Sequence, residues 1–217
     1  MRKSLLVAGA ILTLAAAGAA HAGSVVDPTG DFLGTYAGNH DADLDVTKFS
    51  VTFDGATNLF TLNATFAGAI DPTKAGLYVF GVNTGTGVNH PFGAGGNPDT
   101  GNGNVIFNQV FVVQKTGAAT LGGQTLATTI SGADLGVLVP LSLLPTTGFA
   151  PGQYGWNLWP RNGVGGNNTQ IADFAPDNAT LQAVPEPATW ALMLFGFGAL
   201  GATLRRRRTA MSAVQPA

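Results

Sequence analysis

Apolar side chains stand at every second position in residues 49–53 and again in residues 60–66, and this alternation constrains the fold more than any other feature of the sequence. The apolar positions are Phe49, Val51, Phe53, Phe60, Leu62, Ala64 and Phe66. Because side chains alternate between the two faces of an extended strand, each half of the segment places its apolar residues on one face. Asp54 to Asn58 supply a polar, glycine-containing turn between the halves. The pattern predicts a β-hairpin with one buried and one solvated face.

Short apolar runs bounded by Gly, Pro, Asn or Asp recur along the chain. They cover residues 77–82, 105–114, 126–130, 137–144 and 154–159. Many short strands without an intervening amphipathic helix are typical of an all-β fold, and we expect an antiparallel β-sandwich. Pro140 has no backbone N–H, so the strand that holds it is predicted to be an edge strand or to carry a bulge. The glycine-rich stretch from Asn83 to Asn104 is predicted to be a surface loop.

Residues 23–183 are predicted to form this single sandwich domain. They carry four basic residues against eleven aspartates and no glutamate, a net charge of −7. An acidic domain repels phosphate groups, so nucleic acid is not expected as a partner. The chain has no cysteine, which excludes thiol catalysis and thiolate metal sites.

Aspartates cluster near the start of the domain. Asp41, Asp43 and Asp45 alternate with apolar residues, so an extended backbone would place their carboxylates on one side. A hard cation such as Ca²⁺ would relieve the repulsion between them through oxygen ligands. Other polar groups in this cluster or able to join it are Asp27, Asp31, His40, Asp173 and Asp177.

The spacing of these aspartates imitates the start of an EF-hand loop. Val46 stands where that loop needs glycine, and Thr52 stands where it needs glutamate, so an EF-hand is excluded. Two interpretations remain open. One is a non-helical Ca²⁺ site built on Asp41, Asp43 and Asp45, and the other is a solvated strand face whose charges discourage edge-to-edge pairing.

Aromatic residues form a second candidate site. Tyr154, Trp156 and Leu158 share one face of a predicted strand, and Trp159 lies on the other face near Arg161. Trp156 is predicted to belong to the core. Trp159 and Arg161 offer an amphipathic ring with a polar neighbour, which suits stacking on a sugar, although packing explains a tryptophan equally well.

The sequence offers little support for catalysis. None of Ser50, Ser131 and Ser142 lies in a Gly-x-Ser-x-Gly motif. His40 and His90 have no histidine partner at a metal-binding spacing. We therefore expect that the protein is not an enzyme.

The first 22 residues have the order of a secretory signal peptide. Arg2 and Lys3 precede an apolar run from Leu5 to Ala17, and the small residues Ala20 and Ala22 flank His21. This order predicts export and cleavage after Ala22. Gly23 would then be the first residue of the mature protein.

The C-terminal end combines an extended motif, an apolar run and a basic cluster. Pro185 and Pro187 flank Glu186 and disfavour helix. Trp190 to Leu204 carry no charge, and as a helix they would span about 22 Å against a hydrocarbon core of about 30 Å. The basic cluster that follows, and that should stay on the cytoplasmic side, is Arg205, Arg206, Arg207 and Arg208. A short transmembrane helix is predicted to anchor the exported domain in the inner membrane, with a cytoplasmic C-terminus.

This arrangement resembles the PEP-CTERM sorting domain in its PEPxxWA form, which is found on exported proteins of Gram-negative bacteria. The resemblance rests on the order Pro185-Glu186-Pro187, Trp190-Ala191, apolar run and arginines, and it covers residues 184–208. The polar tail of residues 209–217 departs from the pattern, because such domains usually end soon after the arginines. The resemblance implies recognition by an exosortase, a membrane-embedded cysteine transpeptidase that cuts near the Pro-Glu-Pro motif.

The resemblance also implies delivery to the cell surface or to the exopolysaccharide matrix of a biofilm. We expect a structural or adhesive role there. The expected partners are an exosortase, the inner membrane as a transient or permanent anchor, and exopolysaccharide. The alternative is a non-catalytic carbohydrate- or calcium-binding module, with Ca²⁺ as the cofactor that the aspartates would hold.

Overall fold

The computed structural model describes residues 20–87, 91–163, 167–183 and 196–198, and strands dominate this part of the chain. The strands are β1 (Ala20–Val26), β2 (Val46–Asp54), β3 (Leu59–Phe66), β4 (Leu77–Asn83), β5 (Gln109–Gln114), β6 (Ala119–Leu121), β7 (Gln124–Thr125), β8 (Ala127–Ser131), β9 (Asp134–Pro140), β10 (Gly155–Arg161) and β11 (Leu181–Gln182). Short 3₁₀ helices lie between them: η1 (Ala42–Leu44), η2 (Leu141–Leu143), η3 (Pro151–Gln153) and η4 (Asn168–Gln170).

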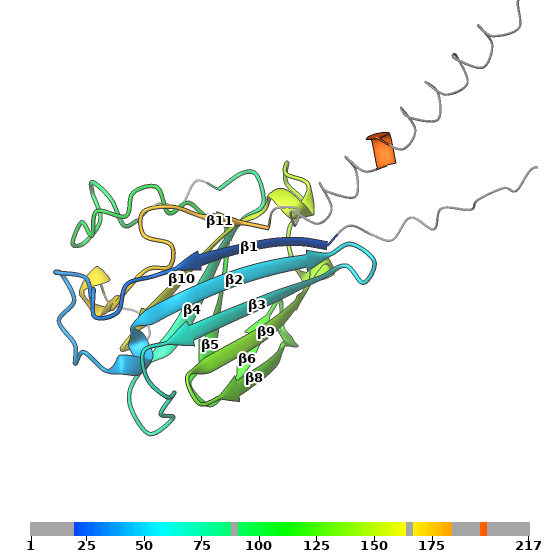
Figure 1. Ribbon diagram of the computed structural model, residues 1–217. Coiled ribbons are helices and arrows are strands. Elements are labelled where there is room, and N and C mark those ends of the chain that lie inside the picture. Colours follow the sequence, from blue (N-terminus) through cyan, green and yellow to red (C-terminus); the bar gives the residue numbers. More distant parts are fainter. Residues whose placement is uncertain (1–19, 88–90, 164–166, 184–195, 199–217) are drawn as a thin grey trace, which may run out of the picture.

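The strands form two antiparallel sheets that face each other (Figure 1). One sheet has the order β1-β2-β3-β9-β8, and the other has the order β11-β10-β4-β5-β6-β7. The all-β, antiparallel character expected from the sequence is confirmed. The layered arrangement is that of a β-sandwich.

The hairpin expected from the alternation at residues 48–66 is present as β2 and β3. Phe53 pairs with Phe60 and Val51 pairs with Leu62 in an antiparallel register. All seven apolar residues of the alternation are buried. This face of the hairpin is therefore one wall of the core, as its period of two requires.

Aromatic rings from the two sheets meet in the space between them. Phe60 on β3 lies 5.1 Å from Trp156 on β10, and Phe66 on β3 lies 4.5 Å from Tyr78 on β4, measured between ring centroids. Trp156 is fully buried, which confirms its predicted place in the core. These contacts join the sheets through large apolar area.

A second apolar cluster covers the outer face of the β10-β4-β5 region. Its buried members are Leu77, Val79, Phe92, Val105, Trp159, Ile171 and Phe174. Phe92 and Val105 come from the glycine-rich segment between β4 and β5, so this loop contributes to the packing. We call this group the outer cluster.

Two details differ from the sequence-based expectations. The strand expected from Val105 begins only at Gln109, because Val105 packs in the outer cluster instead. Pro140 is the last residue of β9, which pairs with β3 and β8 and is not an edge strand. The missing N–H of Pro140 is tolerated because β8 pairs with β9 only as far as Leu138.

The first and last strands of the described domain lie next to each other. A side-chain carbon added to Gly23 on β1 would collide with the carbonyl oxygen of Gln182 on β11, so only glycine allows this approach. Ala20 and Ala22, the small residues of the predicted signal cleavage site, belong to the first half of β1. Residues 1–19 lie outside the described part, so the signal peptide stays a prediction.

Candidate functional site

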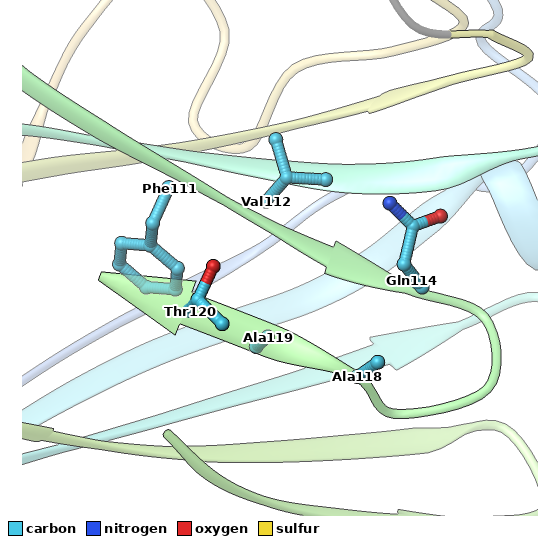
Figure 2. Close-up of a pocket in the computed structure, with 6 residues that line it drawn as sticks. All are labelled: Phe111, Val112, Gln114, Ala118, Ala119 and Thr120. Carbon is cyan, nitrogen blue, oxygen red and sulfur yellow. The ribbon is translucent and has the colours of Figure 1, made fainter. Parts of the chain in front are cut away.

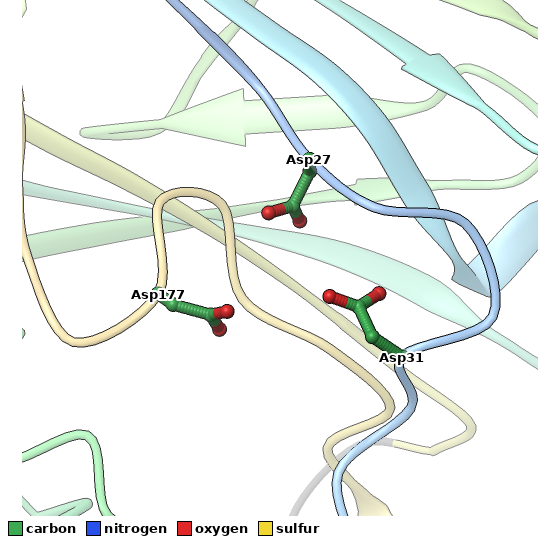
Figure 3. A group of neighbouring side chains, drawn as sticks. All are labelled: Asp27, Asp31 and Asp177. Atoms are coloured by element: carbon green, nitrogen blue, oxygen red, sulfur yellow. The ribbon is translucent and has the colours of Figure 1, made fainter.

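Five aspartates gather at the end of the sandwich where β1 finishes. Asp27 directly follows β1 and Asp31 lies further along the same loop, while Asp45 directly precedes β2. Asp173 and Asp177 come from the segment between β10 and β11. We call these five residues the aspartate cluster. Figure 3 shows the carboxylates of Asp27, Asp31 and Asp177 turned toward one another.

The cluster consists of two groups that share one residue. Carboxylate oxygens of Asp27, Asp31 and Asp177 all lie within 4.8 Å of one another, and so do those of Asp31, Asp45 and Asp173. Asp31 therefore stands at the centre of the arrangement. Three of the five residues are buried: Asp27 is 7 % exposed, Asp45 is 3 % exposed and Asp173 is 1 % exposed.

Backbone N–H groups fix two of the buried carboxylates. Val46 N donates to Asp173 Oδ2 at 2.8 Å, and Phe174 N donates to Asp173 Oδ1 at 2.7 Å. Gly30 N donates to Asp45 Oδ2 at 2.7 Å, which ties the Asp31 loop to the start of β2. These bonds hold the acidic side chains in place before any ligand arrives.

The electrostatic environment of the cluster disfavours negative charge. Burial raises the pKa of Asp27 to about 7, with further contributions from the carboxylates of Asp177, Asp31 and Asp45. Burial also raises the pKa of Asp173 to about 8, against the opposing effect of its backbone hydrogen bonds. Like charges that converge in a partly buried place raise each other's pKa, and a cation would reverse the effect.

The cluster differs from the Ca²⁺ site expected from sequence. Asp41 forms an ion pair with Lys74 at 2.7 Å, and Asp43 forms a buried ion pair with Lys115 at 2.7 Å. Only Asp45 joins the aspartate cluster. Residues 42–44 form the short helix η1 instead of an extended strand, so the three carboxylates do not point to one side. This corrects the expected ligand set of Asp41, Asp43 and Asp45.

Of the residues considered alongside that set, four do converge. Asp27, Asp31, Asp173 and Asp177 were visible in the sequence as acidic residues, but nothing in their spacing showed that the segments 27–31 and 173–177 meet. His40 belongs to neither converging group, and its ring stacks on Phe32 with centroids 4.3 Å apart.

Trp159 lies in the outer cluster and is only 3 % exposed. Its ring contacts Phe92 edge-on at 5.1 Å and Phe107 at 5.2 Å between centroids, and it lies against Gly81 of β4. Arg161 Nη2 donates to the carbonyl of Asn167 at 3.1 Å. Packing therefore covers most of the Trp159 ring, but Trp159 and Arg161 also line a hollow of about 290 Å³, so sugar stacking on this pair stays a prediction.

A hollow beside the β5–β6 hairpin offers less chemistry than the aspartate cluster. A depression of about 390 Å³ lies beside the β5–β6 hairpin and is lined by Phe111, Val112, Gln114, Ala118, Ala119 and Thr120 (Figure 2). None of these side chains is ionisable. This depression therefore supplies no acid, base or charged ligand group.

The predicted sorting segment follows β11 directly. Of the residues predicted to span the membrane, 190–204, only 196–198 are described, and they are helical. Pro185 to Pro187, Trp190, Ala191 and the arginines at 205–208 lie outside the described residues. Within the described part of the chain, no helix has the length and apolar character that a membrane crossing requires.

Comparison with known proteins bears on this segment and not on the sandwich. No curated protein and no solved structure gives a significant match to the chain. A family model matches it at residues 183–208, starting one residue after β11 ends. The match confirms the resemblance found in the sequence: the chain carries the PEP-CTERM protein-sorting motif.

Proposed function

We propose that this protein is an exported β-sandwich that an exosortase processes and delivers to the cell surface or the exopolysaccharide matrix, where it has a structural or adhesive role. The observation that carries the proposal is the PEP-CTERM motif at residues 183–208. Such a motif implies an exosortase as the processing partner.

The position of the motif supports processing of a folded protein. The described domain ends with β11, whose Gln182 pairs with Gly155 of β10. Pro185 and Pro187 follow almost at once, and prolines cannot donate to a ladder and disfavour helix in the preceding residue. An enzyme could therefore cut next to them without unfolding the sandwich.

The two ends of the domain support a defined orientation. Gly23, the predicted first residue of the mature protein, lies against Gln182, the last residue before the motif. The predicted signal peptide and the predicted anchor would leave the domain at the same end. The opposite end, which carries the aspartate cluster about 13 Å from Gly23 along β1, would then point away from the membrane.

We infer a non-catalytic role for the domain. The support for this role is that the groups of possible metal ligands that converge among the described residues consist of aspartates alone. A compact sandwich that a sorting enzyme places outside the cell is suited to holding or spacing matrix components. Exopolysaccharide is the partner that we propose for this role.

Cell fractionation tests the sorting step. We expect the full chain, produced in a host that has an exosortase, to reach the surface or the medium without residues 190–217. A chain with Glu186→Ala, Pro185→Ala and Pro187→Ala should stay in the inner membrane at full length. Gln215→Ala, in the tail beyond the arginines, is the matched control and should sort like the wild type.

Two outcomes would overturn the sorting proposal: unchanged delivery of the Pro-Glu-Pro variant, or equal delivery in a host whose exosortase is deleted. The structural or adhesive role is tested separately by attachment of cells that lack the protein. If these cells attach and build matrix as the wild type does, the role is contradicted while the sorting step stands.

A further inference from the structure

The aspartate cluster brings five carboxyl groups together, and the ion pairs of the described residues include none of them. One oxygen each from Asp27, Asp31 and Asp177 converge within 4.8 Å, and so do one oxygen each from Asp31, Asp45 and Asp173. The two lysines that pair with nearby acids, Lys74 and Lys115, are held by Asp41 and Asp43, which lie outside the cluster. Folding brings these carboxylates together at an electrostatic cost, and such a cost calls for a compensating ligand.

Buried oxygens without partners point to what that ligand is. Asp27 Oδ2 and Asp45 Oδ1 are buried and accept no hydrogen bond from the described residues, and the same holds for Asp31 Oδ1. Asp27 and Asp45 are each more than nine-tenths buried. The carboxylate of Asp27 is aimed at those of Asp31 and Asp177 (Figure 3). Buried polar atoms nearly always have a partner, so these three oxygens are candidate ligand atoms.

We propose that the aspartate cluster binds Ca²⁺ through Asp27, Asp31, Asp45, Asp173 and Asp177. Asp31 belongs to both sets of three converging aspartates and would be the ligand that they share. Both groups consist of carboxylates alone, which suits a hard cation and not a metal that prefers nitrogen or sulfur. Ca²⁺ accepts six to eight oxygens in a flexible geometry, whereas Mg²⁺ demands a near-ideal octahedron and keeps several waters. Backbone carbonyls and water would complete the shell.

The site would clamp segments that are far apart in the sequence. Asp27 and Asp31 belong to the loop after β1 in one sheet, and Asp173 and Asp177 belong to the segment that follows β10 in the other. Phe174, next to Asp173, is fully buried in the outer cluster. Binding would therefore fasten the two sheets together at the end opposite to the sorting tail. This proposal does not depend on the sorting route.

Thermal melting of the purified full chain in detergent, with Ca²⁺ or with a chelator, tests the proposal. At a hundredfold excess over its dissociation constant, Ca²⁺ should raise Tm by about 5–10 °C, and Mg²⁺ at the same concentration should raise it much less. An extracellular site of this kind is expected to bind with a Kd of about 0.1–1 mM, measured by calorimetry.

Asp31→Asn is the discriminating variant, and Asp41→Asn is its matched control. Asp31→Asn should weaken Ca²⁺ binding at least tenfold, yet in the chelator it should melt at or above the wild-type temperature because one repelling charge is gone. A residue with a purely structural role would not give this opposite pair of effects. Asp41→Asn, whose carboxylate pairs with Lys74, should bind Ca²⁺ as the wild type does.

The proposal is overturned if Ca²⁺ gives neither binding heat nor a shift in Tm, or if Asp31→Asn binds it with wild-type affinity. A loss of binding in Asp41→Asn equal to that in Asp31→Asn would also contradict the assigned ligands. Equal shifts with Mg²⁺ and Ca²⁺ would refute the preference for Ca²⁺.

Discussion

Lys115 is a buried cation, only 4 % exposed, and its ammonium lies 2.7 Å from the carboxylate of Asp43. Asp43 Oδ2 also accepts a hydrogen bond from Asp71 N at 2.9 Å, and the backbone oxygen of Asp43 accepts one from the hydroxyl of Tyr78 at 3.1 Å. The pair therefore joins the η1 region to β4 and to the end of β5. Both charged side chains are almost fully buried, so water cannot take the place of a partner that is removed.

Removing the cation of this pair should destabilise the domain strongly. Lys115→Met leaves the buried carboxylate of Asp43 without a counter-charge, and we expect the free energy of unfolding to fall by about 3–5 kcal/mol. Denaturant titration measures the change. Lys74→Met breaks the pair with Asp41, in which the lysine side chain is 52 % exposed, and should lower the free energy of unfolding far less. Similar losses in the two variants would contradict the account of the buried pair.

For single residues, the sequence predicted the chemical character of a side chain better than the residues that it contacts in the fold. It identified the acidic residues that meet in the aspartate cluster, and it separated Trp156 from Trp159 by face. It could not show that Lys115 would neutralise Asp43, since that contact depends on how β5 lies against η1. It also could not show that the ring of Trp159 would be covered by Phe92 and Phe107.

Among the elements, strand β10 packs against both the core between the sheets and the outer cluster. Trp156 and Leu158 point into the space between the sheets, while Trp159 points to the outer cluster. The glycine-rich segment between β4 and β5 closes the outer cluster with Phe92, whose ring lies 4.9 Å from that of Phe174. This segment is thus a packed layer over the sheet.

Truncating Phe92 should loosen this layer without disturbing the inner core. We expect Phe92→Ala to cost about 3–5 kcal/mol and to raise amide hydrogen exchange in residues 91–108, because the ring is 4 % exposed and fills the centre of the outer cluster. Exchange in the β2–β3 hairpin should change little.

Val110→Ala is the control, since Val110 is 39 % exposed on the same sheet and should change stability by less than about 0.5 kcal/mol. Exchange that rises equally in the hairpin and in the loop would mean that the two layers are one cooperative unit.

Alternation of apolar residues was sufficient to predict the hairpin, its buried face and the inward face of β10. The prediction from alternation was wrong where the backbone is not extended. In η1, a 3₁₀ turn at residues 42–44 replaces the extended strand expected for Asp41, Asp43 and Asp45. No strand was predicted at Ala20–Val26, because the small residues there were interpreted as a signal cleavage site. Strand order could not be predicted, since β3 pairs with β9 and β10 pairs with β4 across long stretches of chain.

In the whole molecule, the sorting motif and the aspartate cluster lie toward different ends of the sandwich. Gln182, just before the sorting motif, lies against Gly23 in the middle of β1, and the aspartate cluster lies where β1 ends. Motif, order and position made the sorting segment predictable from sequence alone. The meeting of Gly23 with Gln182, and of Asp31 with Asp173, could not be predicted, because both depend on tertiary packing.

The central claim is that the sandwich is exported as a tailed precursor and released by cleavage at the motif. Intact-mass analysis of the protein recovered from the cell surface tests it most directly. We expect a chain that begins at Gly23 and ends between residues 184 and 188. A mass that retains residues 190–217 would contradict it, because the tail would then be a permanent anchor and not a sorting signal.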